Sequence, residues 1–190
     1  AGAPSLTSAV HVHGRNDRAY PPGVETWDAV RARRNVRAYT DEPIPPEALD
    51  RILEAGRLAP SAQNRQRRDF VLVTDRAQLA ELGTVWRGAG HVPGAQAAIV
   101  VVVPDPEEER FLVIDRFDAG QAVMAMLIVA TDLGIGSGHS SVGDQEAMRR
   151  IIGMPEGHSA VAMIALGYPA DRPLGPPVRL NRRPFDEAVH

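Results

Sequence analysis

The stretch Arg31-Ala-Arg-Arg-Asn-Val-Arg37 places four arginines within seven residues at the end of a predicted helix. All 21 basic residues of the chain are arginine, and lysine is absent. A guanidinium presents a planar fork of donors that can bind a phosphate through two hydrogen bonds. An isolated run of charges is more often a solvated face, so this stretch alone does not establish an anion site.

A second polar stretch, Leu58-Ala-Pro-Ser-Ala-Gln-Asn-Arg-Gln66, lies between a predicted helix and a predicted strand. It supplies one hydroxyl and three amides, from Ser61, Gln63, Asn64 and Gln66. Amides both donate and accept hydrogen bonds, which suits the mixed edge of a flat heterocycle. The two stretches together offer an anion clamp and an amide-rich edge.

The order and separation of these stretches resemble the nitroreductase family, flavoenzymes that bind FMN. Residues 33–39 are similar to the family's Arg-Arg-Ser-x-Arg run and the aromatic residue after it, and residues 59–66 match Ala-Pro-Ser-x-x-Asn-x-Gln. The C-terminal residues 182–190, Arg-Arg-Pro-Phe-Asp-Glu-Ala-Val-His, resemble the family's tail. The resemblance implies an α+β fold, a nitroreductase-like α/β/α sandwich. Its central sheet would be mixed and mostly antiparallel, with a long buried helix at a dimer interface and an extended C-terminal tail.

Length and composition are consistent with one domain of 190 residues. Residues 1–25, rich in small and turn-forming side chains, are expected to form an N-terminal arm. Residues 26–190 are expected to form the FMN-binding domain, with residues 170–190 as its extended tail. His11 and His13 lack neighbouring carboxylates or thiols, so no metal site is predicted.

Several function classes are disfavoured by composition. A net charge of −3 argues against general nucleic-acid binding. The absence of cysteine excludes disulfides and thiolate catalysis, and the absence of lysine excludes Schiff-base chemistry. No signal-peptide pattern and no span of about 20 apolar residues occur, so we expect a cytoplasmic protein without a membrane segment.

Helical periodicity predicts a first helix over residues 26–34, with Thr26 as N-cap and with Trp27 and Val30 facing the core. A second helix should begin at Pro45 or Pro46, because proline is tolerated in the first turn. Its apolar face would carry Leu49, Ile52, Leu53 and Gly56, where the glycine allows close approach of a neighbour. Further helices are expected over residues 76–82 and 144–152, and strands over residues 69–74 and 160–166.

Two other segments are strongly apolar. The β-branched run at residues 97–103 predicts a strand buried on both faces. Residues 118–133 form a helix that is apolar nearly all round, so it must be buried on every side. A second subunit would bury it, and the alternative is a central helix within a monomer.

The glycines at 134, 136 and 138 do not form a dinucleotide fingerprint, because a helix and not a strand precedes them. Residues 133–142 instead resemble the family's glycine-rich loop beside the flavin N5 atom. His139 stands where that loop usually has tryptophan, and it could donate a proton to the acceptor. A loop histidine without a catalytic part is an equally good interpretation.

The resemblance implies specific roles for the polar residues. Arg33 and Arg182 would bind the FMN phosphate, and Arg34 and Asn35 would close around it and the ribityl chain. Arg37 would lie near N1 and the C2 carbonyl of the flavin. Ser61 and Asn64 would bond the pyrimidine edge, and Ser140 and Ser141 would place backbone N–H groups near N5. The predicted reaction is ping-pong, in which FMN takes hydride from NAD(P)H and passes it to a nitroaromatic, a quinone or a similar small acceptor.

Two alternatives stay open: a flavin-binding homodimer that stores or senses FMN without turnover, and a structural homodimer that has lost the flavin. Arg67 and Arg68 replace the proline and aromatic residue that the family has after its asparagine loop. Together with His139 in place of tryptophan, this change predicts a more polar and more cationic pocket, with a preference for acidic acceptors or for the 2′-phosphate of NADPH.

Overall fold

We describe the protein from a computed structural model, which covers residues 25–177 and 182–190. All but one residue of the predicted arm, including His11 and His13, therefore lies outside the described residues. The elements in chain order are α1 (Thr26–Ala32), α2 (Pro46–Leu58), the 3₁₀ turn η1 (Ala62–Asn64), β1 (Asp69–Val73), α3 (Arg76–Leu82), the 3₁₀ turn η2 (Val92–Gly94), β2 (Ala97–Pro104), α4 (Glu109–Asp132), β3 (Gly136–Ser140), α5 (Gln145–Ile152), β4 (His158–Gly167) and α6 (Phe185–Ala188).

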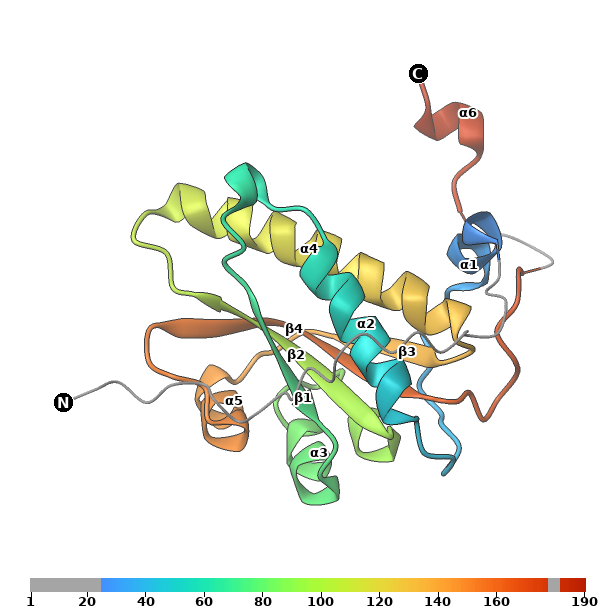
Figure 1. Cartoon of the computed structure of the whole chain (residues 1–190), viewed down its shortest axis with the longest axis horizontal. Helices are drawn as coiled ribbons and strands as arrows, with labels where there is room; N and C mark the ends of the chain where they lie inside the picture. The colour runs from blue at the N-terminus through green and yellow to red at the C-terminus, as the bar shows by residue number, and fades with distance from the viewer. Residues whose placement is uncertain (1–24, 178–181) are drawn as a thin grey trace.

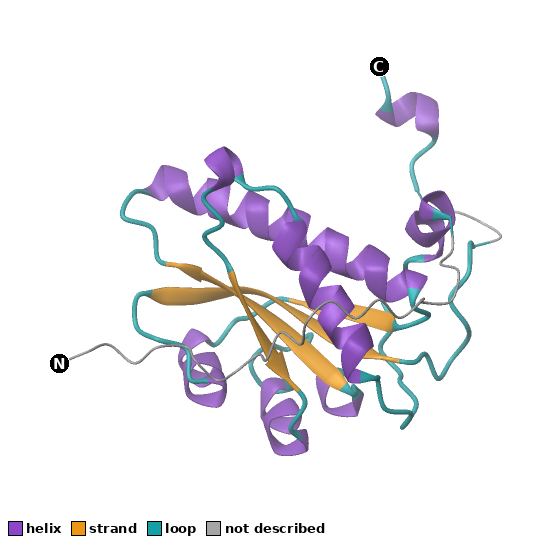
Figure 2. Cartoon of the chain, in the orientation of Figure 1, coloured by secondary structure: helices purple, strands orange, loops and turns teal. Residues whose placement is uncertain are grey.

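The four strands form one sheet in the order β1-β2-β4-β3, and every neighbouring pair is antiparallel. Helices α2 and α4 cover one face, and α3 and α5 lie on the other (Figures 1 and 2). The predicted α/β/α sandwich is therefore confirmed. A mixed sheet was expected, but in the described residues the one parallel contact is the isolated bridge between Asn35 and Ser137.

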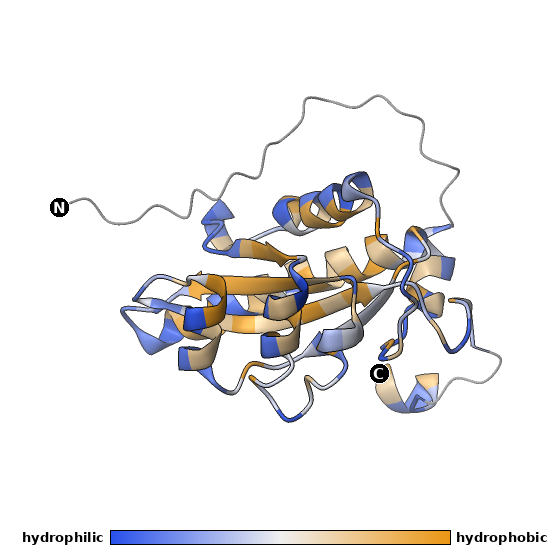
Figure 3. Cartoon of the chain, turned by 90° about the horizontal axis from the view of Figure 1, so that it is seen from below, coloured by the Kyte–Doolittle hydropathy of each residue, from blue (hydrophilic) through white to orange (hydrophobic). Residues whose placement is uncertain are grey.

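Strand β2 separates two hydrophobic cores. Its residues are buried from Ala97 to Val103, as the continuous apolar run predicts. Ile99, Val101 and Val103 pack toward α2 and α4, whereas Ala98, Val100 and Val102 pack toward α3 and α5. This alternation follows the two-residue repeat of a strand and explains why both faces are apolar. The hydropathy colouring shows these strands as largely hydrophobic (Figure 3).

Helix α2 begins as predicted, with Pro46 at its first position. Leu49, Ile52 and Gly56 are buried, and Leu53 packs at the edge of the core. A Cβ added at Gly56 would lie 2.9 Å from the sulfur of Met126 on α4. The glycine therefore allows the two helices to approach closely, as expected.

The prediction for the first helix was wrong in detail. The N-cap is Glu25, and the helix ends at Ala32. Ala29 and Ala32 face α4 and are buried, whereas Trp27 is 68% exposed and Val30 is 38% exposed. A seven-residue helix buries a single narrow stripe, and the small alanines occupy it because they permit close packing.

Helix α4 is longer than predicted, because it begins at Glu109 and not at residue 118. The segment after it was expected to be a loop, but residues 136–140 form the edge strand β3. Within residues 25–177 and 182–190, none of the helices combines the length and apolar character needed to cross a membrane. The short helix α6 stands clear of the sheet (Figure 1), and Phe185 at its start is 80% exposed.

Candidate functional site

The arginine-rich residues 33–39, called the strap here, run along the free edge of β3. The backbone N–H of Val36 donates to the carbonyl oxygen of Ser137 over 2.9 Å. The Tyr39 hydroxyl donates to the Val36 carbonyl oxygen over 2.8 Å, which joins the last residue of the strap to its middle. Burial raises the pKa of Tyr39, so the hydroxyl stays protonated and keeps this bond.

Two glycines in β3 make room for the strap. A Cβ added at Gly138 would lie 2.6 Å from the Val36 carbonyl oxygen and 2.7 Å from the Tyr39 hydroxyl. At Gly136 the added atom would lie 2.7 Å from a methyl group of Val36. The glycines therefore serve close packing, and the helix before them confirms that they are no dinucleotide fingerprint.

Three of the predicted site residues converge on one cavity of about 360 Å³. Arg33 and Asn35 come from the strap and His139 from β3, facing an apolar wall of α4 formed by Gly120, Val123, Met124 and Leu127. An Arg33 Nη1–H donates to the Asn35 side-chain oxygen over 3.3 Å. Among the described residues, no carboxylate lies within ion-pair distance of Arg33 or of the exposed Arg37. The cavity can therefore hold an anion beside an apolar, planar group.

The environment of His139 disfavours its predicted role as a proton donor. Partial burial lowers the pKa of its imidazole, and the positive charge of Arg33 lowers that pKa further. The neutral ring therefore dominates at pH 7. A neutral imidazole is a weak acid, so it is a poor proton donor. It can still lie beside an anion that Arg33 binds.

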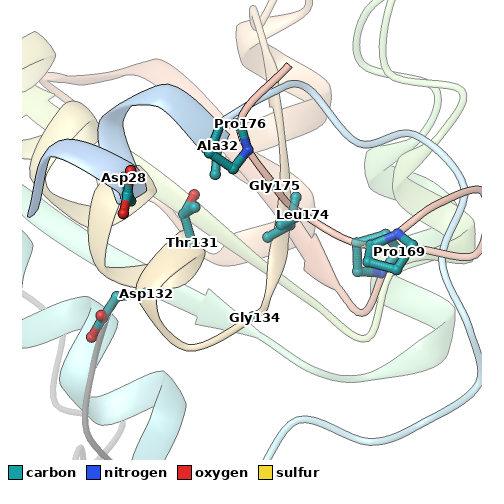
Figure 4. A pocket seen from close by; sticks show the side chains of 10 residues that line it. Asp28, Ala32, Thr131, Asp132, Gly134, Pro169, Leu174, Gly175 and Pro176 are labelled. Atoms are coloured by element: carbon teal, nitrogen blue, oxygen red, sulfur yellow. The ribbon is translucent and has the colours of Figure 1, made fainter. Parts of the chain in front are cut away.

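A larger cavity, of about 530 Å³, lies between α1, the end of α4 and residues 169–176 (Figure 4). The carboxylates of Asp28 and Asp132 lie at its wall, opposite prolines of the C-terminal segment. Both carboxylates are ion-paired, Asp28 with Arg31 and Asp132 with Arg51, and the described residues that line the cavity include no arginine. This cavity therefore offers no cation to a phosphorylated cofactor. The smaller cavity with Arg33 is therefore the candidate site.

Other predicted residues are not among the residues that line that cavity. Arg34 contacts the C-terminal segment, with its Nη2 2.6 Å from the Asp171 carboxylate and 2.7 Å from the Arg172 carbonyl oxygen. Ser140 is buried, and its hydroxyl donates to the carbonyl oxygen of its exposed neighbour Ser141 over 3.2 Å. Arg182 is exposed in the tail.

The predicted amide residues belong to a separate feature, the amide loop of residues 61–66, which contains the turn η1. Gln63, Asn64 and Gln66 have φ of 52°, 54° and 52°, which is unusual for residues other than glycine. The Ser61 hydroxyl oxygen accepts from the Gln66 backbone N–H over 2.9 Å and closes the loop. Asn64 is exposed and so is free to bind a ligand.

The predicted cationic contribution of Arg67 and Arg68 was wrong. Arg68 is 8% exposed and donates to the carbonyl oxygens of Ala59 and Pro60. The Nε of Arg67 lies 3.3 Å from a carboxylate oxygen of Asp115, which is 2% exposed. The Arg68 guanidinium is therefore directed to the protein, and the charge of Arg67, whose side chain is 31% exposed, is countered by Asp115. The preference for acidic acceptors or NADPH stays a prediction.

The sequence interpretation missed the two buried acids of α4, Asp115 and Asp118. An Asp118 carboxylate oxygen accepts from the Ala62 backbone N–H over 2.9 Å. A charged residue within an otherwise apolar helix is the signal that could have identified them, because buried carboxylates require partners.

The amide loop and the strap lie at different ends of α4. The loop contacts Asp118 and the N-terminal half of the helix, whereas α1 and the strap lie toward its C-terminal half (Figure 1). Among the described residues, no hydrogen bond joins the loop to the strap. One chain therefore does not bring the two groups of predicted cofactor ligands together.

Comparison with known proteins identifies the family of this chain. The family model described as "Nitroreductase family" matches residues 30–105 and 85–168. A protein of Archaeoglobus fulgidus, provisionally named NADH dehydrogenase/NAD(P)H nitroreductase, is 36% identical over 77% of this chain and 87% of its own length. The FMN reductase [NAD(P)H] of Bacillus subtilis is 24% identical over 78% of this chain and 67% of its own length.

Solved structures give the same result. A protein of Desulfovibrio desulfuricans, provisionally named a nitroreductase and solved in complex with FMN, superposes with a TM-score of 0.70 at 32% identity, over 85% of this chain and 92% of that one. The NADPH:FMN oxidoreductase of Vibrio harveyi superposes with a TM-score of 0.75 at 23% identity, over 85% and 74% of the two chains. The latter similarity concerns the fold alone.

Proposed function

Because this chain belongs to the nitroreductase family, we propose that it reduces an electron-poor small molecule, such as a nitroaromatic or a quinone, by a ping-pong mechanism. The enzyme class is FMN-dependent NAD(P)H oxidoreductase. When bound, FMN accepts hydride from NAD(P)H and passes it on, so the chain's own residues bind and orient rather than react.

The observation that carries the proposal is the convergence of Arg33, Asn35 and His139 on one cavity. A buried or half-buried phosphate requires cations that are not already neutralised, and Arg33 meets this requirement. Asn35 holds the Arg33 guanidinium in place through the 3.3 Å hydrogen bond. Arg37 is an exposed residue of the same strap, and its charge would stabilise the anionic reduced ring.

We also propose that the protein is a homodimer whose α4 helices face one another. Val113, Phe117 and Met124 are 69%, 68% and 41% exposed, and they fall with Gly120 on one face of α4. A Cβ added at Gly120 would meet no atom within 4 Å, so the described chain does not itself require a glycine there. Glycine costs a helix about 1 kcal/mol relative to alanine, which suggests that another molecule approaches closely at this point.

A second copy would also complete the site. Its amide loop would bring Ser61 and Asn64 to the strap and cavity of the first copy, which one chain does not achieve. Arg182 would bind the phosphate beside Arg33, and Ser140 and Ser141 would present backbone N–H groups. Arg34 would support the strap through its contacts with residues 171 and 172.

The absorbance spectrum of the purified protein tests the proposal. We expect the visible bands of bound flavin, and rapid bleaching when NADH or NADPH is added without oxygen. Bleaching followed by recovery on addition of a quinone supports turnover. A yellow protein that no pyridine nucleotide bleaches would indicate flavin storage or sensing, and a colourless protein that does not bind added FMN would contradict the proposal.

A further inference from the structure

The amide loop is held in a conformation that its residues do not favour. Three non-glycine residues, Gln63, Asn64 and Gln66, adopt positive φ. Such a conformation persists only where the surrounding structure fixes it, and it is often found where a ligand must be contacted. The contacts that fix this loop are therefore candidates for a functional role.

One face of α4 supplies three contacts to this segment. Phe111, Asp115 and Asp118 are spaced at i, i+4 and i+7, so they lie on the same side of the helix. The Arg65 guanidinium lies 4.3 Å from the centre of the Phe111 ring, and the Arg67 Nε lies 3.3 Å from Asp115. Each of the three helix residues thus contacts a different residue of the segment from residue 62 to residue 67.

The Asp118 contact is the most direct of the three. This carboxylate is 6% exposed, and it accepts from the Ala62 backbone N–H, the first amide of η1, over 2.9 Å. Its other oxygen accepts from the Gln121 side-chain amide over 3.4 Å. An ionised acceptor makes a stronger bond to a backbone N–H than a neutral one does.

Arg68 fixes the other end of the same segment. Its guanidinium donates to the carbonyl oxygens of Ala59 and Pro60, just before the loop begins. Arg68 follows the loop in sequence, so these hydrogen bonds connect the residue after the loop to the residues before it. The segment is therefore bonded to the protein at both ends.

We propose that Asp118 is a positioning residue that holds η1 in register and so presents Asn64 to the flavin. This inference rests on the proposed function, because it assumes that Asn64 binds the ring. Asp118 acts through the backbone, since both of its oxygens are occupied by protein donors. A preorganised loop binds more tightly because its ordering entropy is lost on folding and not on binding.

The test compares full-length wild type with Asp118→Ala, Asp118→Asn and Thr131→Ala, all freed of flavin. Thr131 is a matched control because it is also buried on α4, and its hydroxyl donates within the helix, to the Leu127 carbonyl oxygen. FMN affinity is measured by quenching of flavin fluorescence. Loop opening is measured in the flavin-free protein as the rate of tryptic cleavage after Arg65, and stability as the thermal midpoint.

We expect Asp118→Ala to raise the FMN Kd about tenfold and to accelerate cleavage after Arg65, following the loss of a charge-assisted bond. Asp118→Asn keeps an acceptor oxygen and should recover most of both values. Thr131→Ala should change neither the FMN Kd nor the cleavage rate, even if it lowers the thermal midpoint as much as Asp118→Ala does. Phe111→Ala, which removes a half-buried contact at the same loop, should act in the same direction by about threefold.

Equal Kd and equal cleavage rates for Asp118→Ala and wild type would overturn the inference while leaving the proposed function intact. Should Asp118→Ala not fold, an unchanged Kd and cleavage rate in Phe111→Ala would overturn it instead. A wild-type protein that binds no FMN would refute the proposed function itself, and the cleavage assay would then still report whether Asp118 holds the loop.

Discussion

The strap and the amide loop flank the same helix but are held by different forces. The strap is fixed by a backbone hydrogen bond to β3 and by close packing against Gly136 and Gly138, where an added Cβ would overlap Val36. The loop is fixed by buried charges, with Asp118 bonded to a backbone N–H and Arg68 to backbone carbonyls. The strap should therefore be sensitive to added atoms, and the loop to the loss of charged side chains.

The largest effect is expected from Gly138→Ala. The added methyl would lie 2.6 Å from the Val36 carbonyl oxygen, a backbone atom that cannot turn aside. We expect a loss of about 3 kcal/mol in the free energy of unfolding, at the upper end for overpacking, measured by urea denaturation. Gly90→Ala is the control, because its Cβ would meet no atom within 4 Å. A Gly138→Ala protein as stable as this control would mean that the strap is not packed against β3.

A charge on the exposed face of α4 tests whether a second copy joins the two regions. Phe117→Glu changes a side chain that is 68% exposed in the single chain, so folding should be retained. We expect the dimer dissociation constant to rise at least 30-fold, about 2 kcal/mol, as for an aromatic hot spot. Sedimentation velocity measures the change, with Ala80→Glu on the opposite layer as control. A variant that remains dimeric would exclude this face as the interface.

The arginines of the strap should affect cofactor binding without affecting the fold. Arg33→Ala and Arg37→Ala each remove a guanidinium that has no carboxylate partner among the described residues. We expect each to weaken FMN binding about 30-fold, or about 2 kcal/mol, the scale of a hydrogen bond to a charged group. Arg57→Ala, which removes an arginine paired with Glu54 on α2, is the control in the same titration. Unchanged affinity in Arg37→Ala would remove Arg37 from the site.

The same contrast explains how much the sequence revealed. Local patterns were sufficient for β2 and for the start of α2, because burial on two faces and proline at the first turn act within a few residues. They failed for Trp27, whose exposure depends on which stripe of a short helix meets α4. They failed also for Arg67 and Arg68, because their partners, Asp115 and the carbonyls at the end of α2, are set by tertiary packing. An arginine in a motif does not reveal whether its charge faces a ligand or the protein.

The smallest effect concerns the coupling between Arg33 and His139 within the cavity. Burial lowers the pKa of His139, and Arg33 lowers it further. The folded protein then binds fewer protons than the unfolded chain, so the contribution of His139 to stability is full above the unfolded pKa and is lost as pH falls toward the folded value. Arg33→Ala should move the pKa part of the way back toward its ordinary value, because burial remains. NMR titration of the ring resonances measures the shift, with His139→Gln to assign the signal and Arg57→Ala as control. A midpoint that does not rise in Arg33→Ala would show that the guanidinium does not face the imidazole, and the strap would then not deliver its charge to the cavity.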